Sequence, residues 1–345
     1  MPKYVKSAQE IIKMTKKEKI FVTGGSGFVG RNIIRRLISD GYEVYALFRS
    51  DNAQKTVAAI GANPVSGSLE DIDKMQNAMK GCSTVFHVAA NTNNNATEYI
   101  LYKNNVIGTE NVIKAAKFAQ VPLLIYISTD AVVVEKKPIV NVDEKQKTPE
   151  HFSGNYAKTK SIAEKQIIVA NCDELKTIVV RPRLIWGCDD SKFLPSLIRK
   201  VEKKVFFWIN NGRYLTSTCH IYNLCEGLIL AKKHGQGGEI YFLTDGKPIE
   251  FKTFITSLLS TNGIIPPNRS VPFTIIKNFL VTVKALCKII NITPPISLES
   301  LYLLGMEITL DDSKARKEIN YRPIITIQEG LNELFKIYNK NNKSI

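Results

Sequence analysis

The chain has 345 residues, 44% of them hydrophobic, so it can bury a large core and is not disordered. Its 47 basic and 32 acidic residues give a net charge of +15, but the lysines are scattered and form no nucleic-acid-binding motif. The six cysteines have no metal-ligand spacing, among themselves or with the four histidines, so we expect reduced thiols and no metal site.

The N-terminal segment 1–18 is predicted to be an extension that precedes the first domain. Lysines recur through it and it lacks an uninterrupted apolar core, so it is not a secretory signal. The chain has no run of eighteen or more apolar residues free of charge, which argues against a membrane-spanning helix. We therefore expect a cytoplasmic protein.

A glycine-rich turn follows the extension. A buried-strand pattern at 19–23 leads into Gly24, Gly27 and Gly30, and a helical pattern at 31–38 follows without a gap. The first glycine permits a tight turn, the second lets a pyrophosphate approach the backbone, and the third lets the helix pack on the strand. The helix start directs free N–H groups at the phosphates. This order predicts a dinucleotide-binding site.

Strand-like runs recur along the first half of the chain, at 19–23, 43–48, 84–90, 123–128 and 177–181. Helix-like stretches separate the first several, and this alternation predicts an α/β fold with a Rossmann-type doubly wound parallel sheet. Beyond Arg181, prolines and glycines break the chain into short pieces, and a strand candidate at 239–244 is expected to rejoin the first sheet.

A smaller C-terminal substrate domain is predicted, interleaved in sequence with the NAD(P)-binding Rossmann domain. The Rossmann domain is expected over two stretches and the substrate-binding part over two more, namely 19–182 with 219–245, and 183–218 with 246–345.

Tyr156 and Lys160 place a phenol and an ammonium four residues apart, on one face of a predicted helix. A free phenol has a pKa near 10, so it is a poor base at neutral pH, and a nearby ammonium or an oxidised nicotinamide favours its ionised form. This pair alone is common on solvated helices. Its position adds weight, because the strand at 123–127 ends in Ser128-Thr129, at the carboxyl edge where open α/β sheets bind ligands.

These motifs together resemble the extended short-chain dehydrogenase/reductase family, of the NAD-dependent epimerase/dehydratase superfamily. The resemblance covers most of the chain and rests on Thr-Gly-Gly-x-Gly-Phe-x-Gly at 23–30, Ser128-Thr129, Tyr156-x-x-x-Lys160 and further segments at 105–111, 181–187, 220–223 and 314–323. It implies that Tyr156 exchanges the proton, that Lys160 lowers the phenol pKa and holds the ribose, and that Thr129 binds the reacting oxygen.

Other polar residues near these motifs have simpler interpretations. Ser128 is favoured as a strand-end backbone cap over a second substrate hydroxyl. Asn105 and Asn111 either brace strand ends or relay protons. His87 and His151 are interpreted as surface or satisfied core histidines.

The cofactor-binding residues that the turn and the resemblance imply are Gly24, Gly27, Phe28, Val29, Gly30, Arg49, Ser68, Leu69, Ala89, Ala90, Tyr156, Lys160 and Pro182. Arg49 ends the second strand, where NAD-preferring folds carry a carboxylate. Because a guanidinium suits a 2′-phosphate, we favour NADP, with Arg31 assisting, while Asp51 leaves NAD open. Ser68-Leu69 replaces the family's usual Asp-Leu beside the adenine, which leaves adenine recognition open.

Two departures from the family pattern indicate the substrate class. Sugar-nucleotide epimerases and dehydratases carry an asparagine and an arginine for the diphosphate where this chain has Leu184 and Thr216. Each charge-assisted bond contributes about 1.5–3 kcal/mol, so their loss weakens diphosphate binding. The pattern resembles instead the 3β-hydroxysteroid dehydrogenase branch, which implies a bulky hydrophobic substrate, a 3β-hydroxysteroid or a 3-oxo/3-hydroxy fatty derivative. A nucleotide-sugar epimerase/dehydratase and a non-catalytic NADP-binding regulator are the alternatives.

A strongly apolar segment at 272–290 carries Lys277, Lys284 and Lys288 on one helical face. We favour an amphipathic helix that covers the substrate pocket or a dimer seam. The alternative is peripheral contact with a membrane surface. The family resemblance suggests a homodimer formed through two helices of the Rossmann half. The expected partners are a hydrophobic small molecule and a second copy of the chain, without nucleic acid.

Overall fold

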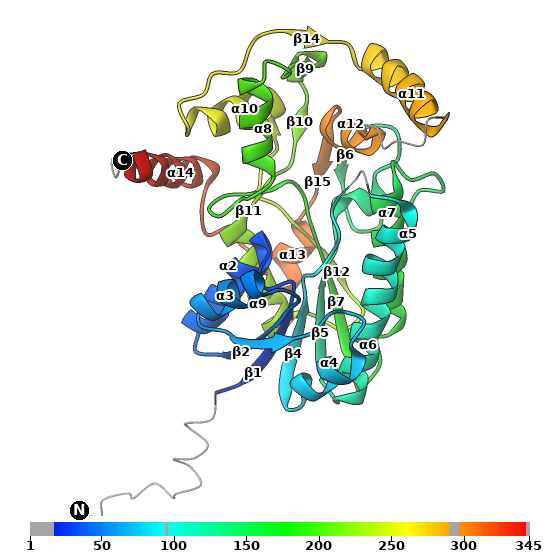
Figure 1. Cartoon of the computed structure of the whole chain (residues 1–345), viewed down its shortest axis with the longest axis vertical. Coiled ribbons are helices and arrows are strands. Elements are labelled where there is room, and N and C mark those ends of the chain that lie inside the picture. The colour runs from blue at the N-terminus through cyan, green and yellow to red at the C-terminus, as the bar shows by residue number, and fades with distance from the viewer. Residues whose placement is uncertain (1–16, 94–95, 290–296, 343–345) are drawn as a thin grey trace, which may run out of the picture.

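The structure is a computed structural model and describes residues 17–93, 96–289 and 297–342. A seven-stranded sheet with its flanking helices occupies one half of the molecule, and smaller sheets and further helices occupy the other (Figure 1). The predicted N-terminal extension lies outside the described residues, apart from its last two positions.

The large sheet is parallel throughout and has the order β12-β7-β5-β4-β1-β2-β3. Its strands are β1 (Lys19–Thr23), β2 (Glu43–Phe48), β3 (Asn63–Ser66), β4 (Cys82–His87), β5 (Leu123–Ile127), β7 (Lys176–Pro182) and β12 (Ile240–Leu243). The strand order reverses between β1 and β4, which is the switch point of a doubly wound sheet. The predicted Rossmann-type fold is confirmed, and the strand predicted at 239–244 rejoins the sheet as β12.

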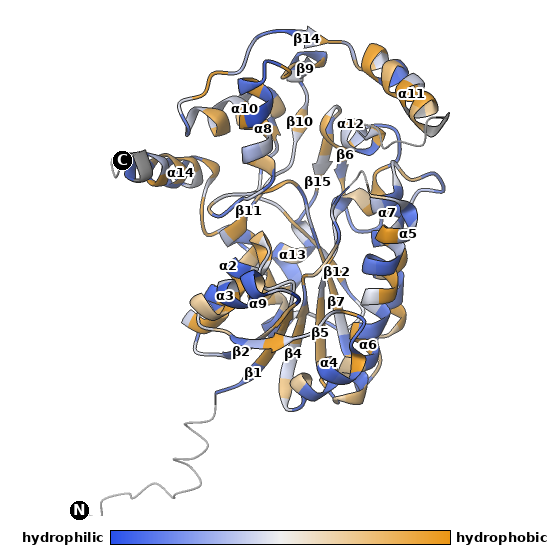
Figure 2. Ribbon diagram, in the orientation of Figure 1, coloured by the Kyte–Doolittle hydropathy of each residue, from blue (hydrophilic) through white to orange (hydrophobic). Residues whose placement is uncertain are grey.

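Helices cover both faces of this sheet because its strand residues alternate between two apolar cores. Ile20 and Val22 pack in one core and Phe21 packs in the other. The first core is covered by α2 (Phe28–Ser39), α3 (Asp51–Ala59), α9 (Ile221–His234) and α13 (Ser313–Glu318), and the second by α4 (Ile72–Met79), α6 (Gly108–Phe118) and α7 (Asn155–Val169). Figure 2 shows these helices with mixed hydrophilic and hydrophobic residues around apolar strands.

The other half of the molecule contains a four-stranded sheet in the order β13-β10-β15-β6. Its strands are β6 (Ile139–Val142), β10 (Leu215–Thr216), β13 (Ile249–Glu250) and β15 (Ile308–Leu310). Two short pairs join β8 (Ile185–Trp186) to β11 (Cys219–His220), and β9 (Trp208–Ile209) to β14 (Ser270–Val271). The helices here are α8 (Phe193–Glu202), α10 (Phe251–Ser260), α11 (Phe273–Ile289), α12 (Leu298–Leu304) and α14 (Ile327–Asn342).

Three helical segments beyond these are short. They are α5 (Glu98–Leu101), η2 (Asp130–Val133) and η3 (Asn210–Gly212). A π-helical turn, η1 (Tyr102–Ile107), joins α5 to α6, and such turns concentrate at functional sites. Within the described ranges, no helix combines the length and the apolar character needed to cross a bilayer.

Some sequence-based boundaries differ from the structure. The strand predicted at 84–90 is β4 at 82–87, because the chain turns away from the sheet after His87. Strand β3 was not predicted, and Leu123–Ile127 is therefore the fifth strand rather than the fourth. An exposed edge strand that contains Pro64 lacks the apolar alternation of its neighbours.

The division of the chain into two domains remains a prediction. Two elements pack in a different half of the molecule from the one to which the predicted boundaries assign them. Strand β6 lies within 19–182 by sequence but pairs with β15 in the four-stranded sheet. Helix α13 lies within 246–345 by sequence but packs in the first core of the seven-stranded sheet through Ala315.

Candidate active site

The glycine-rich turn has the close contacts that a phosphate cradle requires. Gly24 has φ +70°, and a Cβ there would lie 2.7 Å from the backbone nitrogen of Ala89. A Cβ on Gly30 would overlap the carbonyl oxygen of Gly24, so the helix packs directly on the turn. The amide of Gly27 donates to Gly24 O at 3.0 Å, and α2 begins at Phe28, three residues earlier than predicted.

The N-terminus of α2 is free to bind an anion. Its N-cap residue is Gly27, which has no side chain with which to satisfy the first-turn amides. Uncapped amides at the positive end of the helix dipole are suited to phosphate oxygens. The turn therefore fits the pyrophosphate of a dinucleotide coenzyme.

A buried histidine network supports the turn from below. Thr109 Oγ1 donates a hydrogen bond to the Asn105 carbonyl oxygen at 2.6 Å. It therefore accepts the hydrogen bond from His87 Nε2 at 2.9 Å. His87 Nδ1 then accepts from the Thr23 hydroxyl at 2.8 Å, and Thr23 accepts from the Ala89 amide at 3.2 Å. Burial lowers the pKa of His87 to about 3, with a smaller effect from Lys160. His87 is therefore a neutral, satisfied core histidine, as expected.

The predicted coenzyme and catalytic residues gather at one edge of the sheet. They follow the carboxyl ends of successive strands: Gly24 after β1, Arg49 after β2, Ser68 after β3, Ala89 and Ala90 after β4, Thr129 after β5 and Pro182 at the end of β7. Ligands of open α/β sheets bind at this edge, next to the switch point.

Arg49 and Arg31 differ in their surroundings. Arg49 is exposed and forms no hydrogen bond or ion pair with any described residue. Arg31 instead donates to the Ser26 carbonyl oxygen at 2.8 Å and to the Asp189 carbonyl oxygen at 2.9 Å. The guanidinium of Arg31 is therefore already occupied in joining α2 to the loop after β8, so the assisting role expected for it has no support in this geometry.

The loop after β3 is fixed by side chains. The Ser68 amide and hydroxyl both donate to Asp71 Oδ2, at 2.7 and 3.0 Å. Asn111 Nδ2 donates to the Leu69 carbonyl oxygen at 2.8 Å, so Asn111 braces this loop. Asn105 likewise braces the site, because its amide nitrogen donates to Asn91 O at 3.1 Å and to Thr159 Oγ1 on α7 at 3.2 Å.

Tyr156 lies in the first turn of α7, and the Thr129 side chain is among the groups that act on the pKa of its phenol. Burial is the main cause that raises the pKa of its phenol well above the ordinary value, and the carboxylates of Glu299 and Asp130 add to the rise. The Thr129 side chain acts in the opposite direction and lowers this pKa. The resemblance implies that Lys160 lowers this pKa, and that role stays a prediction; in the structure without coenzyme the effect of burial dominates.

Lys160 lies one turn further along α7 and is almost fully buried, with 1% of its surface exposed. Its Nζ donates to the Ile127 carbonyl oxygen at 2.7 Å and lies 4.0 Å from the centroid of the Tyr126 ring. Burial lowers the pKa of this amine to about 7, against a smaller upward effect of Glu164. Lys160 is thus held at the end of β5, beside Ser128-Thr129.

Two buried ion pairs lie close to the candidate catalytic residues. Arg181 is paired with Glu164, which also accepts from the Ser128 hydroxyl at 2.6 Å. Ser128 is therefore bonded to a side chain of α7 instead of the backbone cap that we favoured from the sequence. Sequence inspection did not reveal this pairing, because its partners lie on different elements.

The second pair joins Asp130 to Arg183 at 2.6 Å. Asp130 Oδ1 accepts from the Thr129 hydroxyl at 3.1 Å, so this carboxylate orients the candidate substrate-binding hydroxyl. Arg183 Nε donates to Thr216 Oγ1 at 3.2 Å, and another of its nitrogens donates to the Leu303 carbonyl oxygen at 3.0 Å. Sequence inspection missed Asp130 and Arg183, although both are adjacent to residues of the family pattern.

The side chains at the two positions that distinguish the substrate classes pack against other residues of the protein. Thr216 is fully buried, and its hydroxyl is bonded to Arg183. Leu184 has φ +41° and packs against the apolar core around Trp186 and Trp208. Neither side chain offers a charged or amide contact to a diphosphate.

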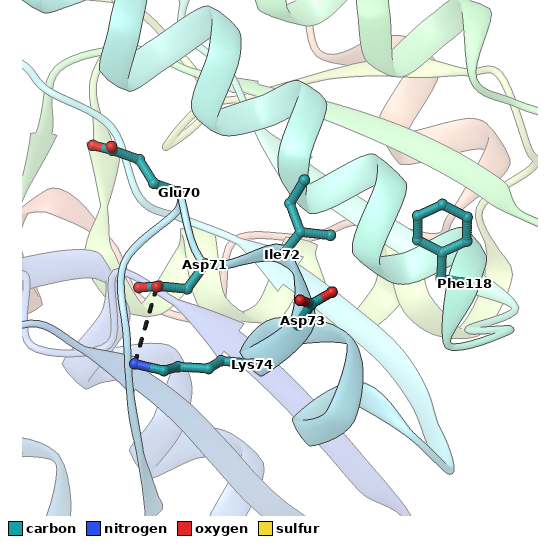
Figure 3. A pocket seen from close by; sticks show the side chains of 6 residues that line it. All are labelled: Glu70, Asp71, Ile72, Asp73, Lys74 and Phe118. Atoms are coloured by element: carbon teal, nitrogen blue, oxygen red, sulfur yellow. Dashed lines mark ion pairs between the residues drawn. The ribbon is translucent and has the colours of Figure 1, made fainter.

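A surface pocket of about 530 Å³ lies apart from this site, between the start of α4 and the end of α6 (Figure 3). It is lined by Glu70, Asp71, Ile72, Asp73, Lys74 and Phe118, and Lys74 lies 4.0 Å from Asp71. None of these is a predicted catalytic residue, so we do not assign the substrate to this pocket. In the part of the chain that the structure describes, no cluster of three or more histidine, cysteine, aspartate or glutamate residues suits a metal ion.

The parallel sheet, the glycine-rich turn and the residues at its carboxyl edge define the class of protein, an extended short-chain dehydrogenase/reductase. A solved structure of DesIV, a dTDP-glucose 4,6-dehydratase double mutant from Streptomyces venezuelae with NAD and DAU bound, has the same fold, with a TM-score of 0.74. It is 21% identical, and the match covers 94% of this chain and 98% of that one.

Sequence comparison defines the family within this class. Residues 21–273 match the model of the 3-beta hydroxysteroid dehydrogenase/isomerase family. The chain is 43% identical to a 4-hydroxy-2-methyl-3-oxo-4-farnesyl-3,4-dihydroquinoline-1-oxide ketoreductase of Stigmatella aurantiaca, over 92% of this chain and 95% of the relative. It is 32% identical to a decarboxylating sterol-4-alpha-carboxylate 3-dehydrogenase of Dictyostelium discoideum, over 92% and 100%. The chain therefore belongs to the 3-beta hydroxysteroid dehydrogenase/isomerase family, as its motifs predicted, and is an oxidoreductase that acts on CH–OH groups.

Proposed function

We propose that this protein is an NADP-dependent oxidoreductase that interconverts a ketone and an alcohol on a bulky hydrophobic molecule, a 3β-hydroxysteroid or a 3-oxo/3-hydroxy fatty derivative. The observation that supports the proposal most is that Thr129 follows β5 at the carboxyl edge of the sheet, where Lys160 of α7, the helix that also carries Tyr156, bonds to the end of that strand. This edge also holds the glycine cradle, so coenzyme and reacting carbon have a common place to meet.

The chain's own residues handle the oxygen and its proton. A bound nicotinamide coenzyme would supply the hydride in a reduction. The Thr129 hydroxyl binds the carbonyl oxygen, for which it exchanges its bond to Asp130. Tyr156 donates its proton to that oxygen as negative charge develops, and its raised pKa in the free protein keeps this proton available. Lys160 orients the ribose from its buried position beside β5.

The hydrophobic substrate class is supported by the residues at 184 and 216. Leu184 packs in an apolar core and Thr216 is buried against Arg183, so the polar contacts for a sugar diphosphate are lacking at both positions. The name of the Stigmatella aurantiaca relative describes a substrate with a farnesyl group and a 3-oxo group. The name of the Dictyostelium discoideum relative refers to a sterol. Both relatives are named for action at a ring carbon of a large apolar molecule, which favours the same class here.

The preference for NADP is supported by Arg49. It is exposed at the end of β2, without an ion pair among the described residues, so its guanidinium is available to a 2′-phosphate. Ser50 caps α3 through a 3.4 Å bond from the Ala53 amide, and it leaves Arg49 in front of the sheet edge.

A homodimer is supported by the surface of α5, η1 and α6, which follow one another end to end as one continuous helical stretch on the outer flank of the large sheet (Figure 1). Tyr99 is 74% exposed and Phe118 is 64% exposed, and Tyr102 and Ile107 are also exposed. Large exposed apolar side chains along one continuous helical stretch are typical of a subunit interface. A second copy of this chain would bury them.

Contact with a membrane surface through 272–290 is supported by the outer face of α11. Ile276 and Leu280 pack inward, whereas Ile275 and Phe279 are 59% and 63% exposed. Exposed Lys277 adds positive charge, to which anionic lipid headgroups are complementary. The side chains of Lys284 and Lys288 lie outside the described residues.

The substrate class is tested by one screen of NADPH and NADH oxidation against 3-ketosteroids, β-keto acids and UDP-sugars. We expect NADPH oxidation with one of the two hydrophobic classes. Turnover of a UDP-sugar without net coenzyme consumption would establish the epimerase or dehydratase alternative instead. Coenzyme binding without turnover of any substrate would favour the regulator.

A further inference from the structure

Glu299 lies in α12 and is bonded to the first turn of α7, from a position 142 residues away from Ala157 in the chain. Its Oε1 accepts the Ala157 amide at 2.7 Å, and its Oε2 accepts the Tyr156 amide at 3.2 Å. The carboxylate is 3% exposed, and no cation among the described residues forms an ion pair with it.

The start of α7 is built to receive this carboxylate. Its N-cap residue is Gly154, which has no side chain and provides no cap of its own. A Cβ at Gly154 would overlap Glu299 Oε2, so a residue with a side chain there would displace the carboxylate. A negative group at a helix N-terminus satisfies orphan amides and interacts favourably with the helix dipole. Glu299 thus supplies the cap that the local sequence lacks.

Helix α12 is also linked to Thr129, through Arg183 and Asp130. The Leu303 carbonyl oxygen accepts from Arg183, Arg183 pairs with Asp130, and Asp130 accepts from the Thr129 hydroxyl. Helix α12, which has seven residues, is therefore linked to both residues with candidate hydroxyl groups, Tyr156 and Thr129. Leu301 of the same helix packs with Ile276 and Leu280 of α11, in the part of the chain assigned to the substrate.

We propose that Glu299 is a positioning residue, which holds the first turn of α7 so that the Tyr156 hydroxyl meets Thr129, and which couples α12 to the catalytic residues. This inference rests on the function proposed above. The groups that act on the phenol are Glu299 from α12, Asp130 from η2 and Thr129, which precedes η2. Removal of the Glu299 charge therefore makes the phenol easier to ionise.

Two substitutions separate the charge from the cap. Glu299→Gln keeps an acceptor oxygen without the charge, and Glu299→Ala removes both. The matched control is Glu329→Gln, because Glu329 Oε2 accepts from the Thr326 amide and hydroxyl at 2.8 Å at the start of α14, far from the site in sequence and exposed. The control also loses a capping charge at a helix start, at an exposed position away from the site, so it shows what the loss of such a charge does without contact to α7.

Two readouts apply to the full chain with NADP. The first is the ionisation of Tyr156, followed by NMR of tyrosine labelled at Cζ and assigned with Tyr156→Phe. We expect its midpoint to fall in Glu299→Gln and to stay at the wild-type value in Glu329→Gln. The second is turnover of the substrate from the screen, where we expect kcat to fall about tenfold in Glu299→Gln and further in Glu299→Ala, with KM nearly unchanged.

The proposal is overturned if Glu299→Gln has the wild-type midpoint and the wild-type kcat, or if the control changes as much. If Glu299→Ala does not fold, Glu299→Gln decides alone, because it retains the acceptor. Tyr156→Phe separates this proposal from the function itself. Loss of turnover in Tyr156→Phe with no effect in Glu299→Gln rejects only the positioning role, and full turnover in Tyr156→Phe rejects the proposed function.

Discussion

Lys160 is an ammonium group that the fold has almost removed from water. Its pKa is lowered from 10.5 to about 7, mainly by burial, so the folded protein binds this proton less tightly than the unfolded chain does. Below about pH 7 both states carry the proton and the folded state bears the full desolvation cost. As the pH rises from 7 toward 10.5 the folded state loses the proton first, and this destabilisation disappears.

Lys160→Met is therefore expected to be more stable than the wild type at neutral and lower pH, by about 2 kcal/mol once the lost bond to Ile127 is included. The gain should shrink as the pH is raised, while turnover is lost. Urea unfolding at several pH values measures it. Lys158→Met is the control, since Lys158 is an exposed residue of the same helix. A gain that does not depend on pH would contradict the buried-ammonium account.

Arg49 determines the choice of coenzyme in this account. Arg49→Ala should weaken NADPH binding about 10- to 100-fold, which corresponds to a charge-assisted bond of about 1.5–3 kcal/mol, and leave NADH binding unchanged. Calorimetric titration with both coenzymes measures this, and Lys55→Ala on the adjacent helix α3 controls for a general loss of positive charge. An equal loss for both coenzymes would remove the 2′-phosphate role.

At the residue scale, the sequence located the side chains that local motifs carry and missed those that other elements contribute. Gly24, Thr129 and Tyr156 could be found because each has a fixed place after a strand or in a helix pattern. Glu299 could not, because its bond to α7 depends on how α12 packs. The raised phenol pKa was missed for the same reason, since its causes include that carboxylate.

Helix α7 is fixed to the sheet by the buried pair of Glu164 with Arg181. Because β7 carries Arg181 and α7 carries Glu164, the pair sets the position of α7 on its sheet face. The bond of Glu164 to Ser128 extends this contact to the end of β5. The element that bears Tyr156 and Lys160 is therefore fixed at both its first turn and its middle.

Glu164→Gln should destabilise the protein by about 3 kcal/mol, because it leaves a buried guanidinium without its counter-charge. It should also lower the pKa of Lys160 further, since Glu164 acts to raise that pKa. Chemical denaturation measures the first effect. Glu110→Gln removes one partner of an exposed pair on α6 and should change stability by less than about 0.5 kcal/mol. Equal losses in the two variants would show that burial of the pair has no special importance.

At the element scale, strong patterns in the sequence were reliable and weak ones were not. The strands 19–23 and 43–48 appear as predicted because each is a run rich in apolar residues, and the predicted helix that carries Tyr156 and Lys160 is α7. The exposed edge strand β3 has no such pattern. The π-helical turn at 102–107 also has no signal in composition, because it arises from the contacts of Asn105 with Asn91 and Thr159.

Among the described residues, exposed large apolar side chains lie along the flank of α5, η1 and α6 and on the outer face of α11. The sequence indicated an amphipathic helix at 272–290 but could not show which face is covered. In the structure the inward face contains Leu280, which is 3% exposed, so a test of the outer face must use other residues.

Ile275→Glu with Phe279→Glu places two negative charges on the outer face of α11 without disturbing its packed side. We expect the wild type to sediment with anionic lipid vesicles and this variant to sediment several-fold less. Val140→Glu, an exposed apolar position on β6, is the control. Equal sedimentation of all three proteins would reject the membrane contact. The remaining roles for α11 would then be a cover over the substrate pocket or a subunit interface.

The central claim is that Tyr156 transfers the proton at the reacting oxygen. Its most direct test is Tyr156→Phe, with turnover measured by NADPH oxidation on the substrate from the screen and coenzyme affinity measured by titration. We expect kcat to fall by at least about a hundredfold, in keeping with loss of a general acid, while NADPH binds nearly as tightly as to the wild type. Unchanged turnover in this variant would contradict the account.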